Sequence, residues 1–158
     1  MKSLNRFLDR RGLSPMWRRL ALGLFLFGCG GTAAELLLLE HFEDPWQWTP
    51  IVLLGLGIVA GALLALRATR GRLRVFQLLM GLYLCAGGLG VYLHLKSNME
   101  FEMEMNPAAG GFDLIVKVFM GAMPALAPGQ MMQMGLLGFL IALGHPALAS
   151  SESPDKGE

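Results

Sequence analysis

The sequence predicts an all-α fold: an integral membrane four-helix bundle with an extra short amphipathic or re-entrant helix before the last span. Composition is the first observation behind this prediction, because 54% of the 158 residues are hydrophobic and 16% are charged, against about 25% charged in a soluble domain. The second is that the hydrophobic residues gather in runs near the roughly 20 residues that a helix needs to cross a bilayer. Each run is expected to be helical, because the bilayer holds no water to satisfy an open backbone.

Four apolar runs define the expected transmembrane domain, residues 20–148. The runs cover residues 20–39, 50–66, 73–95 and 128–148. Pro50 suits a helix start, because the first helical position needs no backbone donor. Polar ends flank this domain: residues 1–19 form a basic segment expected in the cytoplasm or on the membrane surface, and residues 149–158 are expected to form a disordered cytoplasmic tail.

The last third of the chain is less regular than the rest. Pro124, Pro128 and Gly129 are expected to break a helix, because proline lacks a backbone donor and disfavours a helical residue before it. Residues 112–123, ahead of the break, are expected to form an amphipathic or partly inserted helix on the outer side. Whether residues 113–127 are re-entrant, interfacial or part of one kinked span stays open.

Basic and acidic residues gather on alternate sides of the apolar runs. The basic groups before the first run and between the second and third are Lys2, Arg6, Arg10, Arg11, Arg18, Arg19, Arg67, Arg70, Arg72 and Arg74. The gap over residues 40–49 is acidic, and Lys96 at the end of the third run is followed by Glu100, Glu102, Glu104 and Asp113. Because short loops rich in Lys and Arg stay in the cytoplasm, both termini are predicted to be cytoplasmic.

Small residues recur at four-residue spacing within the runs. Gly57 and Gly61 lie on one face of the second run, and Ala86 and Gly90 do so in the third. Lipid supplies no hydrophobic force between helices, so small residues that let backbones approach closely promote association. These stripes are predicted to pack helix against helix, and glycine-lined helices suit a membrane-protein partner or a homo-oligomer.

Glu35 lies inside the first run, about one turn before its outer end. A carboxylate within a span costs roughly 2.5–3.5 kcal/mol, so it usually faces a partner or a cavity. Its expected partners are His94 and Lys96, at the outer end of the third run, and Lys117. The resulting pair is either a structural contact near the interface or part of a proton or cation relay.

Three carboxylates and an imidazole lie directly after the first apolar run: Glu40, His41, Glu43 and Asp44. They are candidate metal ligands, because oxygen ligands suit a hard cation and imidazole suits a transition metal. Their spacing matches no known loop signature, and a solvated acidic loop is the simpler interpretation, so no cofactor is predicted. Residues 99–105 alternate Met or Phe with Glu, and this period of two favours a short extended segment.

Several strings of the sequence occur in a distinctive order. Ala34 to His41 is followed by Trp46-Gln47-Trp48-x-Pro50, then by Phe101-Glu102 to Asn106-Pro107, and then by Pro124 to Gly129 before Gly135-Leu-Leu-Gly138. Together they resemble a group of small uncharacterised bacterial inner-membrane proteins of four predicted helices. The resemblance covers about Ala34 to Pro146. It implies a bacterial inner (cytoplasmic) membrane and no particular activity.

Common catalytic signatures are missing: the sequence has no Gly-x-Ser-x-Gly, His-Glu-x-x-His, phosphate loop or Cys-x-x-Cys. No enzymatic role is therefore predicted, and no nucleic-acid binding, which needs a basic face on a folded domain. The first functional hypothesis is a small accessory or assembly subunit that binds other membrane proteins or itself. The alternative is a small ion or metal transporter, or a metal-handling protein, with an outer vestibule of Glu35, His41 and His94.

Overall fold

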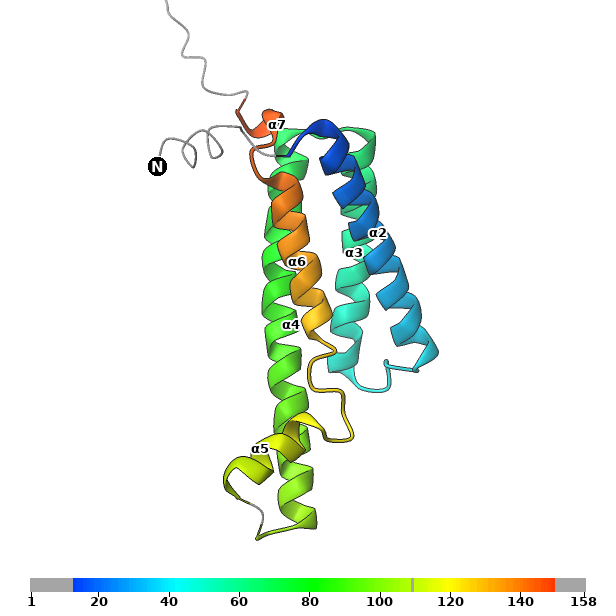
Figure 1. Ribbon diagram of the computed structural model, residues 1–158. Coiled ribbons are helices and arrows are strands. Elements are labelled where there is room, and N and C mark those ends of the chain that lie inside the picture. The colour runs from blue at the N-terminus through cyan, green and yellow to red at the C-terminus, as the bar shows by residue number, and fades with distance from the viewer. Residues whose placement is uncertain (1–12, 109, 150–158) are drawn as a thin grey trace, which may run out of the picture.

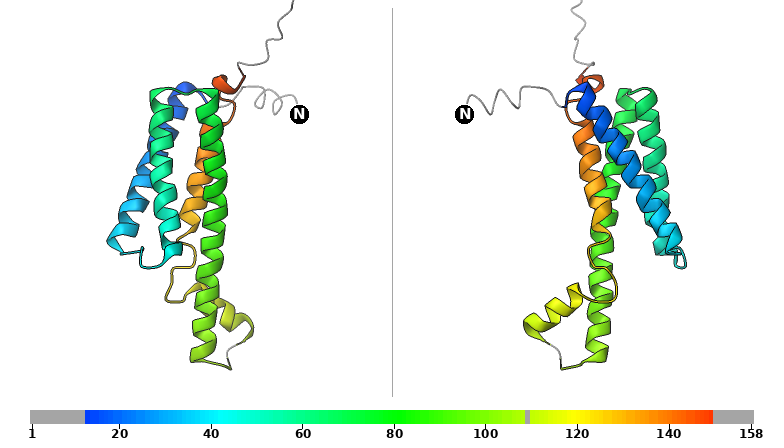
Figure 2. Two further views of the ribbon diagram at one scale, coloured as in Figure 1. Left: turned by 180° about the vertical axis from the view of Figure 1, so that it is seen from behind. Right: turned by 45° about the vertical axis from the view of Figure 1, so that its right-hand side comes forward.

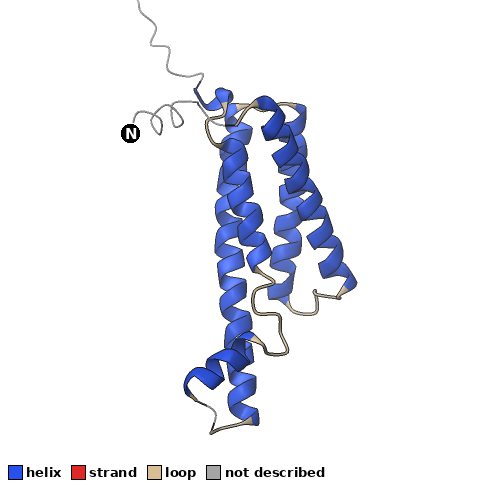
Figure 3. Cartoon of the chain, in the orientation of Figure 1, coloured by secondary structure: helices blue, strands red, loops and turns tan. Residues whose placement is uncertain are grey.

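The computed structural model describes residues 13–108 and 110–149, and their regular elements are helices (Figure 1). In chain order these are α2 (Pro15–Leu38), the 3₁₀ helix η1 (Pro45–Gln47), α3 (Trp48–Leu66), α4 (Arg70–Met105), α5 (Gly111–Phe119), α6 (Gly129–Ala142) and α7 (Pro146–Ala149). No strand occurs in the described residues (Figure 3), so the predicted all-α class is confirmed. Most of the expected basic segment, residues 1–12, and residues 150–158 of the expected tail lie outside the described residues.

Three helical stretches are long and apolar enough to cross a membrane. They are Pro15–Leu38, Pro45–Leu66 and Arg70–Met105. The second starts sharply because Asp44 caps η1: its Oδ1 accepts a hydrogen bond from the Trp46 amide at 3.3 Å, while Gln47 Oε1 accepts one from the Asp44 amide at 3.2 Å. The third starts at Thr69, whose hydroxyl accepts from the Arg72 amide at 3.3 Å. Such caps satisfy first-turn donors that have no partner within the helix.

The fourth expected span differs from the structure. Of residues 128–148, α6 takes only Gly129–Ala142, and the chain turns before the short α7. The helix ends there because Gly144 has a φ of 58°, a left-handed conformation that glycine adopts at little cost, and because Pro146 carries no amide hydrogen. A single kinked helix from Asp113 onward is not formed either, since residues 120–128 separate α5 from α6 with turns.

The extended segment predicted for residues 99–105 is also wrong, because α4 stays helical to Met105. Met and Glu are both good helix formers, so their alternation does not oppose a helix. An ion pair at i,i+4 spacing, with Lys96 Nζ 3.5 Å from Glu100 Oε1, adds support at the start of this stretch. With 36 residues, α4 is about 54 Å long.

Four helices, α2, α3, α4 and α6, form a closed ring in which each packs against two others (Figure 2). Their shared core includes Phe25 and Cys29 of α2, Leu54 of α3 and Tyr83 of α4. Tyr83 is fully buried, and its hydroxyl donates to the Leu53 carbonyl oxygen at 3.0 Å and lies 3.5 Å from Cys29 Sγ. One side chain thereby connects three of the four helices.

Charge is separated along the length of the molecule. The start of α2, the α3–α4 turn and α7 lie together at one end (Figure 1). We call this the arginine-rich end, since the described charged residues there are Arg18, Arg19, Arg67, Arg70, Arg72 and Arg74. The opposite part, the acidic end, carries Glu35, Glu40, Glu43, Asp44, Glu100, Glu102, Glu104 and Asp113, with Lys96 and Lys117.

Candidate functional site

The far part of α4 extends well beyond the other three helices of the ring, and α5 packs against it (Figure 1). We define the arm as α4 from Lys96 to Met105 together with α5. Large apolar side chains on the arm remain exposed. They are Met99, Phe101, Met103 and Met105 of α4 and Phe112, Ile115, Val116, Phe119 and Met120 in or next to α5. The arm is therefore the candidate functional site, because it combines exposed apolar side chains with carboxylates.

α5 is amphipathic by its sequence pattern. Phe112, Ile115 and Phe119 recur at three- and four-residue spacing, which places them on one side of the helix, and all three are exposed. Asp113 in the first turn and Lys117 in the last turn suit the helix dipole, and their side chains pair at 3.1 Å. The amphipathic helix expected over residues 112–123 thus exists over Gly111–Phe119, and its apolar stripe is uncovered.

Asn98 holds the segment after α5 onto α4. Its Nδ2 donates to the carbonyl oxygens of Val118 at 2.9 Å and Met123 at 2.8 Å, and its Oδ1 accepts from the Met123 amide at 3.0 Å. The side chain is 3% exposed. Gly121 lies directly over it, since a Cβ at Gly121 would be 2.6 Å from Asn98 Cγ. These contacts fix the base of the arm.

The predicted helix break runs along α4 on the same side. His94, one turn before Asn98 in α4, has its Nδ1 3.1 Å from the Pro124 carbonyl oxygen. Farther along, a Cβ at Gly90 would lie 2.6 Å from Pro128 Cβ, so Gly90 makes room for that ring. Gly129 then opens α6. The three break residues therefore form the connection from the arm to α6.

The other predicted packing residues also lie at helix contacts. A Cβ at Gly57 would collide with the Tyr83 hydroxyl, and one at Gly61 would lie 2.8 Å from Leu26 Cδ2. Both glycines are buried. Ala86 is partly buried and packs against the core. Small residues thus let α3 approach α2 and α4 closely.

Glu35 is exposed near the end of α2. Its carboxylate makes no hydrogen bond or ion pair with any residue that the structure describes, and the described partner of Lys96 is Glu100. His94 instead contacts the Pro124 carbonyl. The structure does not bring Glu35, His94 and Lys96 together as a bonded group, and their joint role stays a prediction.

The candidate metal residues lie in the α2–α3 connection. Glu40, Glu43 and Asp44 are exposed and His41 is half-buried. Burial lowers the pKa of His41, and the charge of the nearby His94 lowers it further, so His41 is biased toward the neutral form. Within residues 13–108 and 110–149, no three His, Cys, Asp or Glu side chains are grouped so that they could hold a metal ion.

Sequence reasoning missed Asn98, the buried polar side chain at the base of the arm. It stands in the polar stretch Lys96-Ser97-Asn98, where nothing distinguishes it from its neighbours. Its partners lie 20 and 25 residues away, so only the tertiary structure reveals them.

Comparison of this chain with protein-family models, with curated proteins and with solved structures finds no significant match.

Proposed function

We propose that this chain is a small multi-pass protein of a bacterial inner membrane and acts as an accessory or assembly subunit. In this proposal the ring of helices is a transmembrane four-helix bundle, and both termini are cytoplasmic. The arm binds the extramembrane part of a larger membrane protein on the outer side. The observation that most strongly supports the proposal is the length of α4.

The length of α4 supports a position of the arm outside the hydrocarbon. A bilayer core is about 30 Å thick, which about 20 residues of a straight helix cross. If Arg70 lies at the inner boundary, the outer boundary falls near Gly90. The segment from Lys96 to Met105 then begins about 9 Å beyond that boundary and extends into water, where exposed phenylalanine and methionine are unfavourable unless another surface covers them.

Charge indicates what kind of surface covers the arm. Lys96 and Lys117 are already paired with Glu100 and Asp113. Glu102 and Glu104 have no ion-pair partner among the described residues, so the arm carries net negative charge. That charge opposes a second copy of the arm and an anionic lipid surface. It favours a partner protein whose surface is apolar and basic.

Photo-cross-linking tests this proposal. A photoreactive amino acid is introduced at position 112 or, as a control, at position 27; Phe112 and Phe27 are both 79% exposed, but Phe27 would face lipid. We expect a protein adduct at position 112 and none at position 27. Reversing the charge with Glu102→Lys and Glu104→Lys should abolish the adduct at position 112.

Three results would contradict the proposal. Adducts of equal yield at positions 112 and 27 would mean that the arm has no special affinity for protein. An adduct that still forms after both charge reversals would show that the partner surface is not basic. An adduct with the mass of two copies of this chain would show that the arm binds a second copy of the chain.

A further inference from the structure

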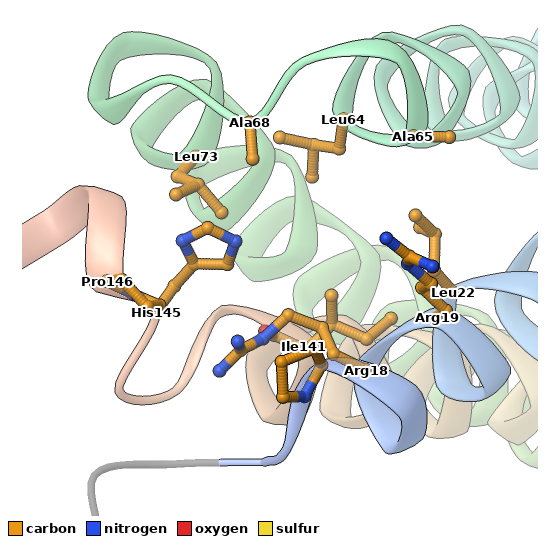
Figure 4. Close-up of a pocket in the computed structure, with 11 residues that line it drawn as sticks. Arg18, Arg19, Leu22, Leu64, Ala65, Ala68, Leu73, Ile141, His145 and Pro146 are labelled. Atoms are coloured by element: carbon orange, nitrogen blue, oxygen red, sulfur yellow. The ribbon is translucent and has the colours of Figure 1, made fainter.

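A cavity of about 320 Å³ lies at the arginine-rich end, the end opposite the arm (Figure 4 shows the cavity). Its lining comes from the start of α2, the end of α3, the α3–α4 turn, the start of α4, the end of α6 and the residues that follow α6. The polar side chains around it are Arg18, Arg19 and His145. All three can carry positive charge, and none of the eleven lining residues is acidic.

Arg18 has hydrogen-bonding capacity left over. Its Nε donates to the Ile141 carbonyl oxygen at 2.9 Å and its Nη2 to the Leu143 carbonyl oxygen at 3.2 Å, which caps the end of α6. Nη1 has no partner among the described residues. Arg19 is exposed, and its guanidinium has no described partner at all. Two guanidinium groups with spare donors therefore border one cavity.

His145 adds a third donor. Its Nδ1 accepts a hydrogen bond from the Ala147 amide at 3.1 Å, so a neutral ring carries its proton on Nε2. Burial and the charge of Arg18 lower the pKa of His145, which favours that neutral ring. Figure 4 shows its imidazole at the cavity, together with Arg18 and Arg19.

The start of α2 also favours an anion. Pro15, the first residue of α2, lines the cavity, and Ser14 makes no side-chain cap for the first turn. Pro15 has no amide hydrogen to donate, so the N-terminus of α2 contributes through its dipole, which attracts negative charge. These features act in the same direction as the two arginines.

Apolar side chains form much of the remaining lining. Leu22, Leu64, Leu73 and Ile141 come from four different helices. A free inorganic anion would gain nothing from them, whereas the glycerol and upper acyl region of a lipid would bury apolar surface there. Basic pockets between transmembrane helices at the cytoplasmic side are suited to anionic lipid headgroups.

We propose that this cavity binds the phosphate of an anionic phospholipid, with Arg19 and Arg18 Nη1 as the main donors. The proposal rests on the membrane insertion proposed above but not on the arm or its partner. It gives the arginine-rich end a binding role in addition to its effect on topology.

Lipid binding to the full chain in a neutral detergent tests this site. Native mass spectrometry gives dissociation constants for phosphatidylglycerol, phosphatidylcholine and inorganic phosphate. We expect phosphatidylglycerol to bind at least about tenfold more tightly than phosphatidylcholine, whose choline cation the arginines repel, and than inorganic phosphate, which buries no apolar surface. Arg19→Gln should weaken phosphatidylglycerol binding about tenfold, the loss expected for one charge-assisted hydrogen bond. Arg18 is left unchanged because it also caps α6.

Arg74→Gln is the matched control. Arg74 is exposed at the same end of the molecule and does not line the cavity. Arg74→Gln therefore removes the same charge as Arg19→Gln without changing the proposed site. We expect its effect on affinity to stay below about twofold. Equal losses in the two variants, or equal affinity for the two lipids, would overturn the site. Inorganic phosphate binding as tightly as phosphatidylglycerol would overturn the lipid as its ligand.

Both variants, Arg19→Gln and Arg74→Gln, leave residues 96–119 of the arm region unchanged. A failure of the cross-linking experiment therefore has no bearing on the lipid site, and a failure here leaves the partner proposal standing.

Discussion

At position 98 a single amide side chain satisfies three backbone groups from a distant part of the chain. Each buried hydrogen bond contributes about 1 kcal/mol, and a carbonyl or amide left without its partner costs more. The charged residues nearby contribute less, since Lys96–Glu100 and Asp113–Lys117 are solvent-exposed pairs of the kind that is worth little. The orientation of the arm therefore depends on Asn98 more than on its ion pairs.

Replacing Asn98 tests this conclusion. We expect Asn98→Ala to free the segment around Met123, because its carbonyls and amide lose a buried partner. Hydrogen exchange is the direct measurement: protection of the Met123 amide should fall by at least about tenfold, the equivalent of 1.4 kcal/mol.

Ser97→Ala serves as the control, since the Ser97 side chain has no described hydrogen bond. Unchanged protection at Met123 in Asn98→Ala would show that the segment is held by something else.

Among the elements, the contact between α4 and α6 depends on close backbone approach. A Cβ at Gly87 would lie 2.6 Å from Met132 Cγ and 2.9 Å from the Met132 backbone nitrogen, so the backbone itself would have to move. A Cβ at Gly88, the next residue, would meet nothing within 4 Å. The two glycines differ only in which face of α4 they occupy.

This difference gives a matched pair of variants. Gly87→Ala should lower the free energy of unfolding by about 1–3 kcal/mol, as overpacking of a tight contact does. Gly88→Ala should leave it unchanged or raise it slightly, because alanine favours a helix. Thermal unfolding in detergent, followed by circular dichroism, compares them. Equal effects in the two variants would mean that α4 and α6 are not in contact along this face.

Helix ends show where sequence reasoning works and where it does not. Each of the first three apolar runs corresponds to a long helix, and in the first two runs the hydrophobic length and the helix length agree. They disagree in α4, where the apolar run ends near Leu95 but the helix continues to Met105. Hydropathy reports which residues suit lipid, whereas continuation of a helix depends on propensity and on local ion pairs.

The candidate sites were less predictable than the helices. The glycine pair of α3 could be predicted because a four-residue spacing is local. The cavity at the arginine-rich end could not, since Arg18 and Ile141 meet across 123 residues of sequence. Its one local signal was that basic residues and His145 all flank apolar runs at the end assigned to the cytoplasm.

For the molecule as a whole, the separation of charge is the feature that joins the two proposals. Arginines gather at one end and carboxylates at the other. In a bacterial inner membrane the arginine-rich end would remain in the cytoplasm, where it meets anionic lipid, and the acidic arm would stand on the outer side. The proposed partner site depends on this orientation, whereas the proposed lipid site depends only on insertion into a membrane.

Site-directed labelling measures that orientation most directly. With Cys29 and Cys85 replaced by serine, Glu104→Cys places a thiol on the arm and Gly71→Cys places one at the start of α4, next to the α3–α4 turn. Intact spheroplasts are treated with a membrane-impermeant maleimide before and after permeabilisation. We predict that the Glu104→Cys variant reacts in intact spheroplasts and that the Gly71→Cys variant reacts only after permeabilisation. Reaction of both variants in intact spheroplasts, or the reverse order, would contradict the account.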